Sequence, residues 1–348
     1  MILVEQGQSP LILCLPHSGS DVPKAVNTRL NATGRLQADL AWRLERVFDF
    51  HKDLDMTVIR SSVSRYVIDL DKDPSTYANA PTDTAGSLCP ALTLDGKRIY
   101  QDGEEPGPTE AEQRVLLFHQ PFHKALLSQI DRLTRIHGRV VILDCQSMRS
   151  QIKGVTDKGL PLVNIGSLDG ASCNRDLRNL FVGSFNGLEG FTIGVDEQTR
   201  GGFIAQCYGR PGQGLHCMTF LLAQRAYLRH ESPPFEPDKT RIARLQSVLK
   251  DSFSRVIDWA SVGAKPQAVA TISAQPDTFG QAAGQAEVDA PAPVNETTDQ
   301  TATVPDPQAE VDAGAEHEII PVDPMTLPKL PKATDAPANK NLPLQVAE

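Results

Sequence analysis

The sequence predicts an α/β fold of three layers, in which a twisted, mostly parallel or mixed sheet carries helices on both faces. Short apolar runs of strand length recur along the chain, for example at residues 11–15 and 140–143. Longer stretches with apolar residues at helical spacing separate them, as at residues 109–137. Strands that are apolar along their whole length are buried on both sides, so helices are expected to cover each face of the sheet.

The first hundred residues predict two strands with a helix between them. A strand at 11–15 is followed by the turn Pro-His-Ser-Gly-Ser, which brings polar side chains to the edge of the sheet. Residues 36–50 have the apolar spacing of a helix, and residues 56–59 predict the next strand. The stretch 74–101 is rich in Pro, Thr, Asp, Ala and Gly, which predicts a long excursion over the surface near the ligand site.

The rest of the folded part continues the alternation. Residues 109–137 predict a helix with acidic residues in its first turn and an interruption near Pro121. The apolar strand 140–143 is expected to stop at Asp144 and to deliver the polar cluster that follows it into a cleft. Further strands are predicted at 162–166, 190–195 and 218–222, and further helices at 175–180 and 241–262.

The composition changes sharply near the end of the last predicted helix. Residues 1–262 are expected to form the folded domain, and residues 263–348 a disordered, acidic tail rich in Pro and Ala, because few of its residues can be buried. From Lys265 onward there are four lysines, no arginine and thirteen acidic residues, a net charge of −9 that equals the −9 of the whole chain. The folded part is therefore nearly neutral.

Charge and hydropathy exclude several classes of protein. Binding to nucleic acid is not expected, because it needs a concentrated basic face and the acidic tail would repel phosphates. No apolar run is long enough to span a bilayer, and the N-terminus lacks the pattern of a secretion signal, so we expect a cytoplasmic protein without a membrane partner. The six cysteines are scattered and are expected to be buried free thiols.

Several short motifs together resemble one known family, over roughly residues 11–231. They are Pro16-His17-Ser18-Gly19, Ser64-Arg65-Tyr66-Val67-Ile68-Asp69, Asp144-Cys145-Gln146-Ser147-Met148-Arg149, Leu168-Asp169-Gly170-Ala171-Ser172-Cys173 and Tyr208-Gly209-Arg210-Pro211. In combination they resemble the N-formylglutamate amidohydrolase family of zinc-dependent deformylases. This resemblance implies a fold like that of the zinc carboxypeptidases or phosphorylase/hydrolases, and a site for zinc. Each motif alone is weakly specific.

The resemblance also implies which residues hold the metal and activate water. His17 matches the first zinc ligand of the family, whereas Ala41 stands at the acidic second ligand and Gln146 at the histidine that is the third. Leu221 stands at the position of the glutamate that acts as general base, so no catalytic residue of the family is intact. A small shift in alignment would let Asp39, Glu45 or Asp49 replace Ala41. A neutral amide is a poor ligand for zinc, so no cofactor is expected unless the chain is an active enzyme.

The resemblance implies that part of a substrate-binding site remains. Guanidinium groups suit the bidentate capture of carboxylates. The alternative for each arginine is a surface ion pair with a neighbouring aspartate. His123 matches a histidine of the family and either reaches the site or packs within its helix. The expected substrate-binding residues are His17, Ser18, Arg65, Gln146, Ser147, Arg149 and Arg210.

Three functions follow from these observations as hypotheses. The leading one is a catalytically degenerate homologue that binds a small carboxylate-bearing ligand or a protein partner. The second is an active, metal-dependent amidohydrolase that releases formate or another acyl group from an N-acyl amino acid and uses zinc. The third is an interaction scaffold that acts through its tail, where residues 318–328 place apolar side chains between acids and form a candidate docking segment for a protein, or a spacer.

Overall fold

The sheet has seven strands, and its order shows how distant parts of the chain meet. The computed structural model describes residues 1–75 and 86–262. The strand order is β1-β3-β2-β4-β7-β5-β6. The strands are β1 (Ile2–Glu5), β2 (Leu11–Leu15), β3 (Thr57–Ser61), β4 (Val140–Met148), β5 (Val163–Gly166), β6 (Ile193–Val195) and β7 (Leu215–Ala223).

Most neighbouring strands are parallel. β2 pairs in parallel with β3 and β4, β4 with β7, and β5 with β6, whereas β1–β3 and β5–β7 are antiparallel. The predicted α/β fold with a mixed sheet is confirmed. β4 and β7 lie at the centre, and their nine paired positions bring the ends of both strands into register. The sheet thereby fixes which side chains can meet at the carboxyl end of β4.

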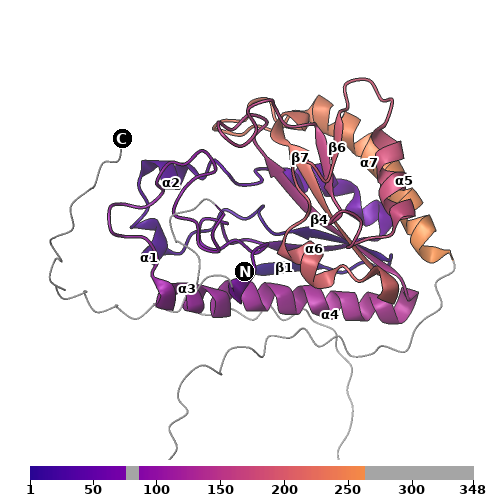
Figure 1. Ribbon diagram of the computed structural model, residues 1–348, viewed down its shortest axis with the longest axis horizontal. Coiled ribbons are helices and arrows are strands. Elements are labelled where there is room, and N and C mark those ends of the chain that lie inside the picture. The colour runs from indigo at the N-terminus through magenta and orange to yellow at the C-terminus, as the bar shows by residue number, and fades with distance from the viewer. Residues whose placement is uncertain (76–85, 263–348) are drawn as a thin grey trace, which may run out of the picture. The chain divides into compact units, whose positions relative to one another are not determined.

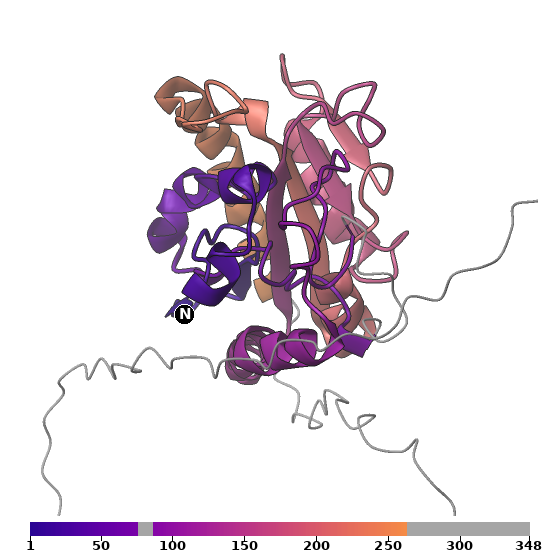
Figure 2. The same ribbon diagram turned by 90° about the vertical axis from the view of Figure 1, so that its left-hand side faces the viewer.

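Helices cover both faces of this sheet. Figure 1 shows α4 running along one side of the sheet and α5 and α7 on another, and Figure 2 shows α4 nearly end-on. The helices are α1 (Lys24–Asn27), α2 (Ala32–Leu36), α3 (Pro108–Arg114), α4 (Gln120–His137), α5 (Arg175–Phe185), α6 (Phe203–Tyr208) and α7 (Lys239–Ser261). There are also helical segments of other types. The 3-10 helices are η1 (Leu44–Leu54), η4 (Pro211–Gln213) and η5 (Gln224–Ala226), and the π turn is η3 (Val115–His119).

The side chains of β4 alternate between two apolar layers, as the period of a strand requires. Val141, Leu143 and Cys145 belong to the layer under η1, α5 and α7, in which Phe253 is stacked on Phe48. Val140 and Ile142 belong to the layer under α4 and α6. The three-layer arrangement follows from this double burial. At its carboxyl end the second face of β4 becomes polar, and the candidate site begins there.

The strand predicted at 140–143 is longer than expected. β4 extends to Met148, so the polar residues from Asp144 to Gln146 are still part of the strand. The prediction that the strand stops at Asp144 is wrong, because pairing with β7 supplies backbone hydrogen bonds that do not depend on the polarity of the side chains. The site is consequently built on a rigid strand.

The helix predicted at residues 36–50 is also wrong in its limits. Asn31 caps α2, which ends where Gln37 adopts a left-handed conformation, and η1 begins only after Arg43, a second left-handed residue. Leu40 and Ala41 lie between the two helical segments and are buried. Apolar spacing alone does not distinguish a continuous helix from a helix, a turn and a second helix.

The interruption predicted near Pro121 takes the form of a π turn. The amide of Gln120 donates to the carbonyl of Val115, five residues earlier, so the chain widens just before the proline. Proline has no N–H and crowds the carbonyl four residues before it, and a wider turn accommodates both effects. The helical segments α3, η3 and α4 follow one another without a break.

The stretch 74–101 is described at residues 74–75 and 86–101, and the second part is not a surface excursion as predicted. Leu88, Cys89, Ile99 and Tyr100 are buried, and the last two pack in a cluster with Leu30 and Tyr66. The sequence pattern did not indicate that these apolar side chains are buried, because they are few and irregularly spaced within a polar stretch. The predicted tail (263–348) and its segment 318–328 lie outside the described residues.

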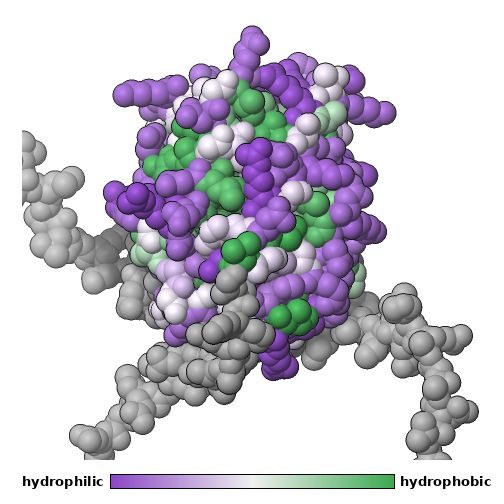
Figure 3. Space-filling view, turned by 90° about the vertical axis from the view of Figure 1, so that its right-hand side faces the viewer, coloured by the Kyte–Doolittle hydropathy of each residue, from purple (hydrophilic) through white to green (hydrophobic). Residues whose placement is uncertain are grey.

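The surface of the described part carries few large apolar side chains. The face in Figure 3 is mostly hydrophilic, with hydrophobic areas scattered over it. All six cysteines are free, as predicted, and all but Cys207 are buried. Within residues 1–75 and 86–262, no helix has the length and hydropathy needed to cross a membrane.

Candidate functional site

His17 follows the carboxyl end of β2 and is fixed by a buried carboxylate. Its Nε2 lies 2.7 Å from Oδ1 of Asp69, which is 1 % exposed. A carboxylate only accepts, so His17 Nε2 carries the hydrogen. Arg65 Nη2 donates to the other oxygen of Asp69 at 2.8 Å. Burial raises the pKa of Asp69, but His17 and Arg65 outweigh it and hold that pKa well below its usual range.

Nδ1 of His17 makes no hydrogen bond with any residue that the structure describes. A carboxylate that holds one ring nitrogen of a histidine orients the other one for a ligand or a reacting group. Asp69 was quoted in a motif but not predicted as a site residue. The only signal for it was its place at the end of an apolar segment, four residues after Arg65.

Gln146, on β4, forms the centre of a second cluster. Its Nε2 donates to Oδ2 of Asp71 at 2.8 Å and to Oδ2 of Asp144 at 2.7 Å. Thr219 Oγ1 donates to the same oxygen of Asp144 at 3.0 Å. Gln146, Asp144 and Thr219 meet because β4 and β7 are in parallel register, with Asp144 opposite Thr219. Both hydrogens of one neutral amide are thus shared between two buried acids.

The two acids of this cluster hold protons more tightly than free aspartates do. Burial, followed by the charge of Asp71, raises the pKa of Asp144 well above its usual value. Burial and the charge of Asp69 raise the pKa of Asp71, although the amide of Ile204 and the side chain of Gln146 oppose this. No cation among the described residues hydrogen bonds to either carboxylate. Both shifts favour retention of a proton within the pair.

Arg149 and Asp39 form a third group. Arg149 Nη2 lies 2.9 Å from Oδ1 of Asp39 and 3.4 Å from Oδ1 of Asp95. Tyr66 Oη and the amide of Leu94 both donate to the other oxygen of Asp39, each at 2.8 Å. Asp39, one of the alternatives to Ala41 as a metal ligand, therefore already has both oxygens engaged in hydrogen bonds. A surface ion pair was the alternative for Arg149, and the pair that it forms with Asp39 is largely buried.

Both arginines keep donors that are not used by the protein. Nε of Arg65 and Nε of Arg149 are buried without a hydrogen-bond partner in the described part of the chain. The Nη1 groups of these two residues likewise have no hydrogen bond to it. Each guanidinium carries five N–H donors, of which the aspartates take only some. Capacity for an added carboxylate therefore remains at both side chains.

The positions where the family's ligands and base were expected lie beside these clusters. The amide of Ala41 donates to the carbonyl of His17 at 3.0 Å, so the two residues are adjacent. Leu221 is directly opposite Gln146 in the β4–β7 register and is 7 % exposed, and it packs against Leu160 and Ala223. The positions that the resemblance assigns to ligands and base are therefore neighbours in space in two pairs, Ala41 with His17 and Leu221 with Gln146. Ala41 and Leu221, however, are apolar.

Of three further residues that were predicted to bind substrate, only Ser18 lies beside these clusters, whereas Ser147 and Arg210 do not. Ser18 stays beside His17, where its hydroxyl donates to the carbonyl of Leu15 at 3.3 Å. Ser147 is one residue after Gln146 on a strand, so its side chain faces the opposite side of the sheet, and its hydroxyl lies 2.7 Å from Tyr227 Oη. The structure does not bring Ser147 into the groups around His17, Gln146 or Arg149.

Arg210 lies at the other end of the sheet. Its amide bonds to the carbonyl of Leu215, the residue opposite Val140, whereas Gln146 pairs with Leu221, which is about 20 Å further along β7 at the rise of a strand. Its guanidinium donates to carbonyls at the end of α6. Arg210 therefore closes a helix end, and the structure does not place it beside Arg65 or Arg149.

Two histidines outside the predicted site hold the segment that carries Asp71. His123 Nε2 donates to the carbonyl of Leu70 and its Nδ1 accepts from Tyr208 Oη, both at 2.9 Å. His119 Nε2 donates to the carbonyl of Lys72 at 2.9 Å. Burial lowers the pKa of His123 to about 3. Both ring nitrogens of His123 are used, so it packs within the fold, which was one of the two alternatives.

The donors at the site do not fit a zinc ion. Within residues 1–75 and 86–262, no group of three or more His, Cys, Asp or Glu side chains is arranged to hold a metal. Gln146 turns its N–H donors, not its oxygen, toward the two acids. Zinc requires several anionic or imidazole donors around one point, and here an alanine and an amide stand at two of the positions. We therefore describe no step through a metal.

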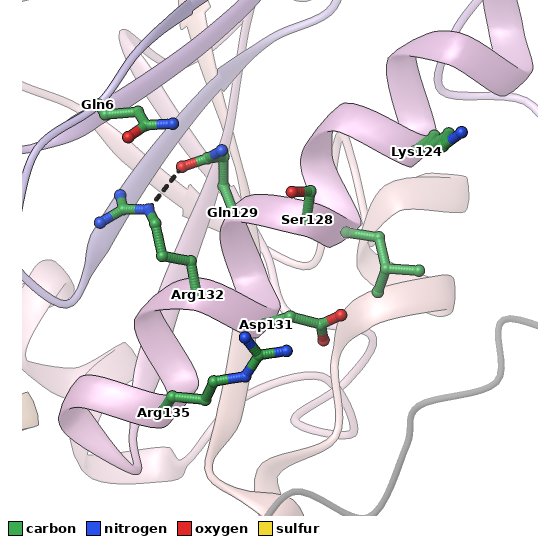
Figure 4. A pocket seen from close by; sticks show the side chains of 8 residues that line it. Gln6, Lys124, Ser128, Gln129, Asp131, Arg132 and Arg135 are labelled. Atoms are coloured by element: carbon green, nitrogen blue, oxygen red, sulfur yellow. Dashed lines mark hydrogen bonds between the residues drawn. The ribbon is translucent and has the colours of Figure 1, made fainter. Parts of the chain in front are cut away.

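A separate pocket lies along α4, beside the residue that follows β1. Its volume is about 450 Å³, and Figure 4 shows its lining side chains together with the hydrogen bond from Arg132 to Gln129. Arg132 also donates to the carbonyl of Gly7 and to Thr57, so it joins α4 to the sheet. None of the lining residues belongs to the clusters around His17, Gln146 or Arg149.

Comparison with known proteins points to one family. The family model described as N-formylglutamate amidohydrolase matches residues 9–228. A relative from Pseudomonas putida, named N-formylglutamate deformylase, is 31% identical over 259 residues, which cover 74% of this chain and 95% of the relative. A protein of the same name from Pseudomonas aeruginosa is 28% identical over 256 residues, 73% of this chain and 95% of the relative.

Solved structures agree in fold. The crystal structure of an N-formylglutamate amidohydrolase from Ralstonia eutropha JMP134 superposes with a TM-score of 0.61 at 20% identity, over 74% of this chain and 97% of that one. A gene product from Agrobacterium tumefaciens gives a TM-score of 0.55 at 15% identity, over 73% and 95% of the two chains. At these identities the likeness concerns the fold alone.

Proposed function

This chain belongs to the N-formylglutamate amidohydrolase family, and we propose that within it the chain has lost metal-dependent hydrolysis but still binds a small carboxylate-bearing ligand. One observation carries the proposal: Gln146, at the position of a histidine ligand, donates its amide hydrogens to Asp71 and Asp144. Its neighbour in the sheet, at the position of the general base, is Leu221.

The expected loss of rate is large. A hydrolase of this kind uses the metal to lower the pKa of a bound water and a carboxylate to accept its proton. Loss of the general base alone typically lowers a rate by about 10² to 10⁴-fold, and loss of the metal-bound water lowers it further. Leu221 cannot accept a proton, and the nearby acids Asp71 and Asp144 are bonded to Gln146. Turnover near the uncatalysed background is therefore expected.

Binding rests on different side chains. Arg65 and Arg149 each hold an aspartate through one Nη group and keep other donors unused among the described residues. Charge-assisted hydrogen bonds from a guanidinium to a carboxylate contribute about 1.5–3 kcal/mol each. His17, which shares Asp69 with Arg65, offers Nδ1 as a further polar group. These groups favour a ligand that carries a carboxylate and one further polar group.

The active-enzyme alternative keeps one supporting observation, and a direct experiment separates it from the proposal. The match to the deformylase from Pseudomonas putida covers 95% of that relative, so most of its length has a counterpart in this chain. Purified full-length chain should contain far less than one zinc per molecule by elemental analysis. It should not release formate from N-formylglutamate above background, with or without added zinc. Zinc near one equivalent together with turnover that a chelator abolishes would end the proposal.

Ligand binding is tested with matched arginine variants. Titration of the full chain with glutamate or N-formylglutamate should raise its unfolding temperature, as expected for a ligand that binds only the folded state. Arg149→Lys, which removes the planar fork but keeps the charge, should weaken binding about tenfold or more. Arg210→Lys is the control, because Arg210 closes the end of α6. An equal effect of both variants would contradict a binding role for Arg149.

A further inference from the structure

Asp71, Asp144 and Gln146 form a hydrogen-bonded group of three. The proposed function uses this group as an observation but does not say why an amide lies between two acids. The acids are buried, with Asp144 fully enclosed, whereas Gln146 is only partly buried. Nε2 of Gln146 lies between one oxygen of each acid, at 2.8 and 2.7 Å. A neutral amide nitrogen thus stands where two carboxylates converge, a place that electrostatics would assign to a cation.

We propose that the side-chain amide of Gln146 takes the place of a cation between Asp71 and Asp144, and that removing this amide opens a divalent-cation site that the natural chain keeps closed. The inference rests on the proposed function in one respect, since both hold that the natural chain binds no metal here. It goes further by naming Gln146, and not Ala41 or Leu221, as the residue that excludes the ion.

The orientation of the amide is set by its surroundings. If the amide were reversed, its oxygen would face two carboxylate oxygens and repel both, whereas the NH2 group donates to both. Gln146 is therefore held with its donors inward, and its Oε1 has no hydrogen bond to any described residue. The side chain closes the space between the acids from the partly exposed side of the cluster.

Oxygen atoms around the amide of Gln146 can accept further interactions. Oδ1 of Asp144 is buried and has no hydrogen-bond partner among the described residues, although the side chain is fully enclosed. Thr219 adds a hydroxyl oxygen at 3.0 Å from Asp144 Oδ2. An unpartnered carboxylate oxygen in the interior is costly, and a cation would satisfy it. Two carboxylates, a hydroxyl and water are the ligands that Mg²⁺, Mn²⁺ and Ca²⁺ prefer.

The charges around the acids also favour a cation. Asp69 lies next to them, because its Oδ1 accepts from the amide of Asp71 at 3.0 Å, but its charge is already matched by His17 and Arg65. Asp71 and Asp144 have only neutral donors among the described residues: Gln146, Thr219 and the amide of Ile204. An ion that displaced the amide would meet the negative charge of this pair and would compete with the proton that the pair retains.

The frame around Asp71 is rigid enough to keep its shape without the amide. Asp71 Oδ1 accepts from the amide of Ile204 at 2.8 Å at the start of α6. A side chain at Gly202 would collide with the Asp71 carboxylate, since its Cβ would lie 1.8 Å from Oδ2. His119 and His123 hold the carbonyls on either side of Asp71. The carboxylate should therefore stay in place when position 146 changes.

The experiment uses Mn²⁺ alone as the probe, with full-length natural chain and two variants that change position 146 in opposite ways. Gln146→Ala removes the amide, and Gln146→Glu replaces its nitrogen by a third carboxylate oxygen. Gln206→Ala is the matched control, because Gln206 is exposed on α6. Free Mn²⁺ is measured by electron paramagnetic resonance during titration, and thermal unfolding is followed with and without the ion.

The natural chain and Gln206→Ala should show no saturable binding and no Mn²⁺-dependent rise in unfolding temperature. Both variants at position 146 should bind Mn²⁺ at least tenfold more tightly than the natural chain, and Gln146→Glu more tightly than Gln146→Ala. Adding Asp144→Asn to Gln146→Glu should abolish the gain. The inference is overturned if both variants keep the native circular dichroism but gain no affinity, or if the natural chain binds Mn²⁺ equally well.

Failure of this inference can be distinguished from failure of the proposed function. Chelator-sensitive hydrolysis by the natural chain contradicts the proposed function, whatever the variants at position 146 do. Absence of cation binding by these variants, in a natural chain that is inert and free of metal, contradicts the inference alone. A gain that survives Asp144→Asn would also contradict it, because the ion would then lie elsewhere.

Discussion

At the scale of single residues, the site depends on side chains that are shared rather than free. Asp69 accepts hydrogen bonds from His17, 52 residues away in the chain, and from Arg65, 4 residues away. Asp39 accepts one from Arg149, 110 residues away. The arginines and His17 were predicted from their motifs. Of their acidic partners, Asp69 was not predicted as a site residue and Asp39 was named only as a possible replacement for Ala41. An aspartate in a sequence does not indicate which distant cation it will face in the fold.

His123 supplies a prediction of pH dependence. Burial, and then the charge of His119, lower its pKa from 6.5 to about 3. A histidine whose pKa falls on folding stays neutral in the native state, whereas in the unfolded chain it takes up a proton below about pH 6.5. Stability is therefore lost as the pH falls from about 6.5 toward 3. At pH 5 the cost from His123 is about 2 kcal/mol.

The measurement is urea unfolding at pH 7 and pH 5. His123→Gln cannot take up a proton, so its free energy of unfolding should fall about 2 kcal/mol less between these pH values than that of the natural chain. Lys124→Gln is the control, since Lys124 is an exposed neighbour on the same helix. If His123→Gln and the natural chain lose stability in parallel, His123 does not carry the effect.

At the scale of elements, the type of strands and helices was predictable, but only some of their ends were. The limits of α7 at Lys239 and Ser261 agree with the prediction of 241–262 to within two residues, because its apolar period is regular and Asp238 caps it. β4 ran five residues past its predicted end, because pairing with β7 extends across polar residues. A capped amphipathic helix is specified locally, whereas the length of a strand is decided by its neighbours.

The cap of α7 can be tested. Asp238 accepts from the amides of Thr240 and Arg241 at 3.0 and 3.1 Å. Asp238→Ala leaves these donors without a side-chain acceptor, and the free energy of unfolding should fall by about 1 kcal/mol. Asp251→Ala removes an exposed carboxylate paired with Arg255 in the middle of the same helix and should change it by less than about 0.5 kcal/mol. Equal losses in urea unfolding would contradict a capping role.

At the scale of the whole molecule, the described residues contain the apolar layers on both faces of the sheet. The buried residues of the largest cluster run from Leu11 to Ala260, and they include Phe253, stacked on Phe48 and packed against Phe181 and Phe220. All of them belong to one compact unit of the chain. The boundary predicted at residue 262 falls at the end of α7 and remains a prediction.

Truncation tests that boundary. A chain that ends at Val262 should unfold at the same temperature as the full chain, to within about 2 °C, and with the same dependence on denaturant. The reason is that the slope of stability against denaturant reports the surface buried on folding, and the buried clusters lie within residues 11–260. A markedly lower unfolding temperature or a smaller slope would show that residues beyond 262 contribute to the fold.

The sequence by itself determined the family, the α/β class, most of the strands and helices, and the absence of the expected side chains at Ala41, Gln146 and Leu221. These conclusions depend on local period and on motifs, which are properties of neighbouring residues. Only the tertiary structure decided that Gln146 faces Asp71 and Asp144, that Ser147 points to the opposite face, and that Arg210 lies at the far end of the sheet. Strand register and chain crossover decide such contacts, and they arise between segments that are far apart in the sequence.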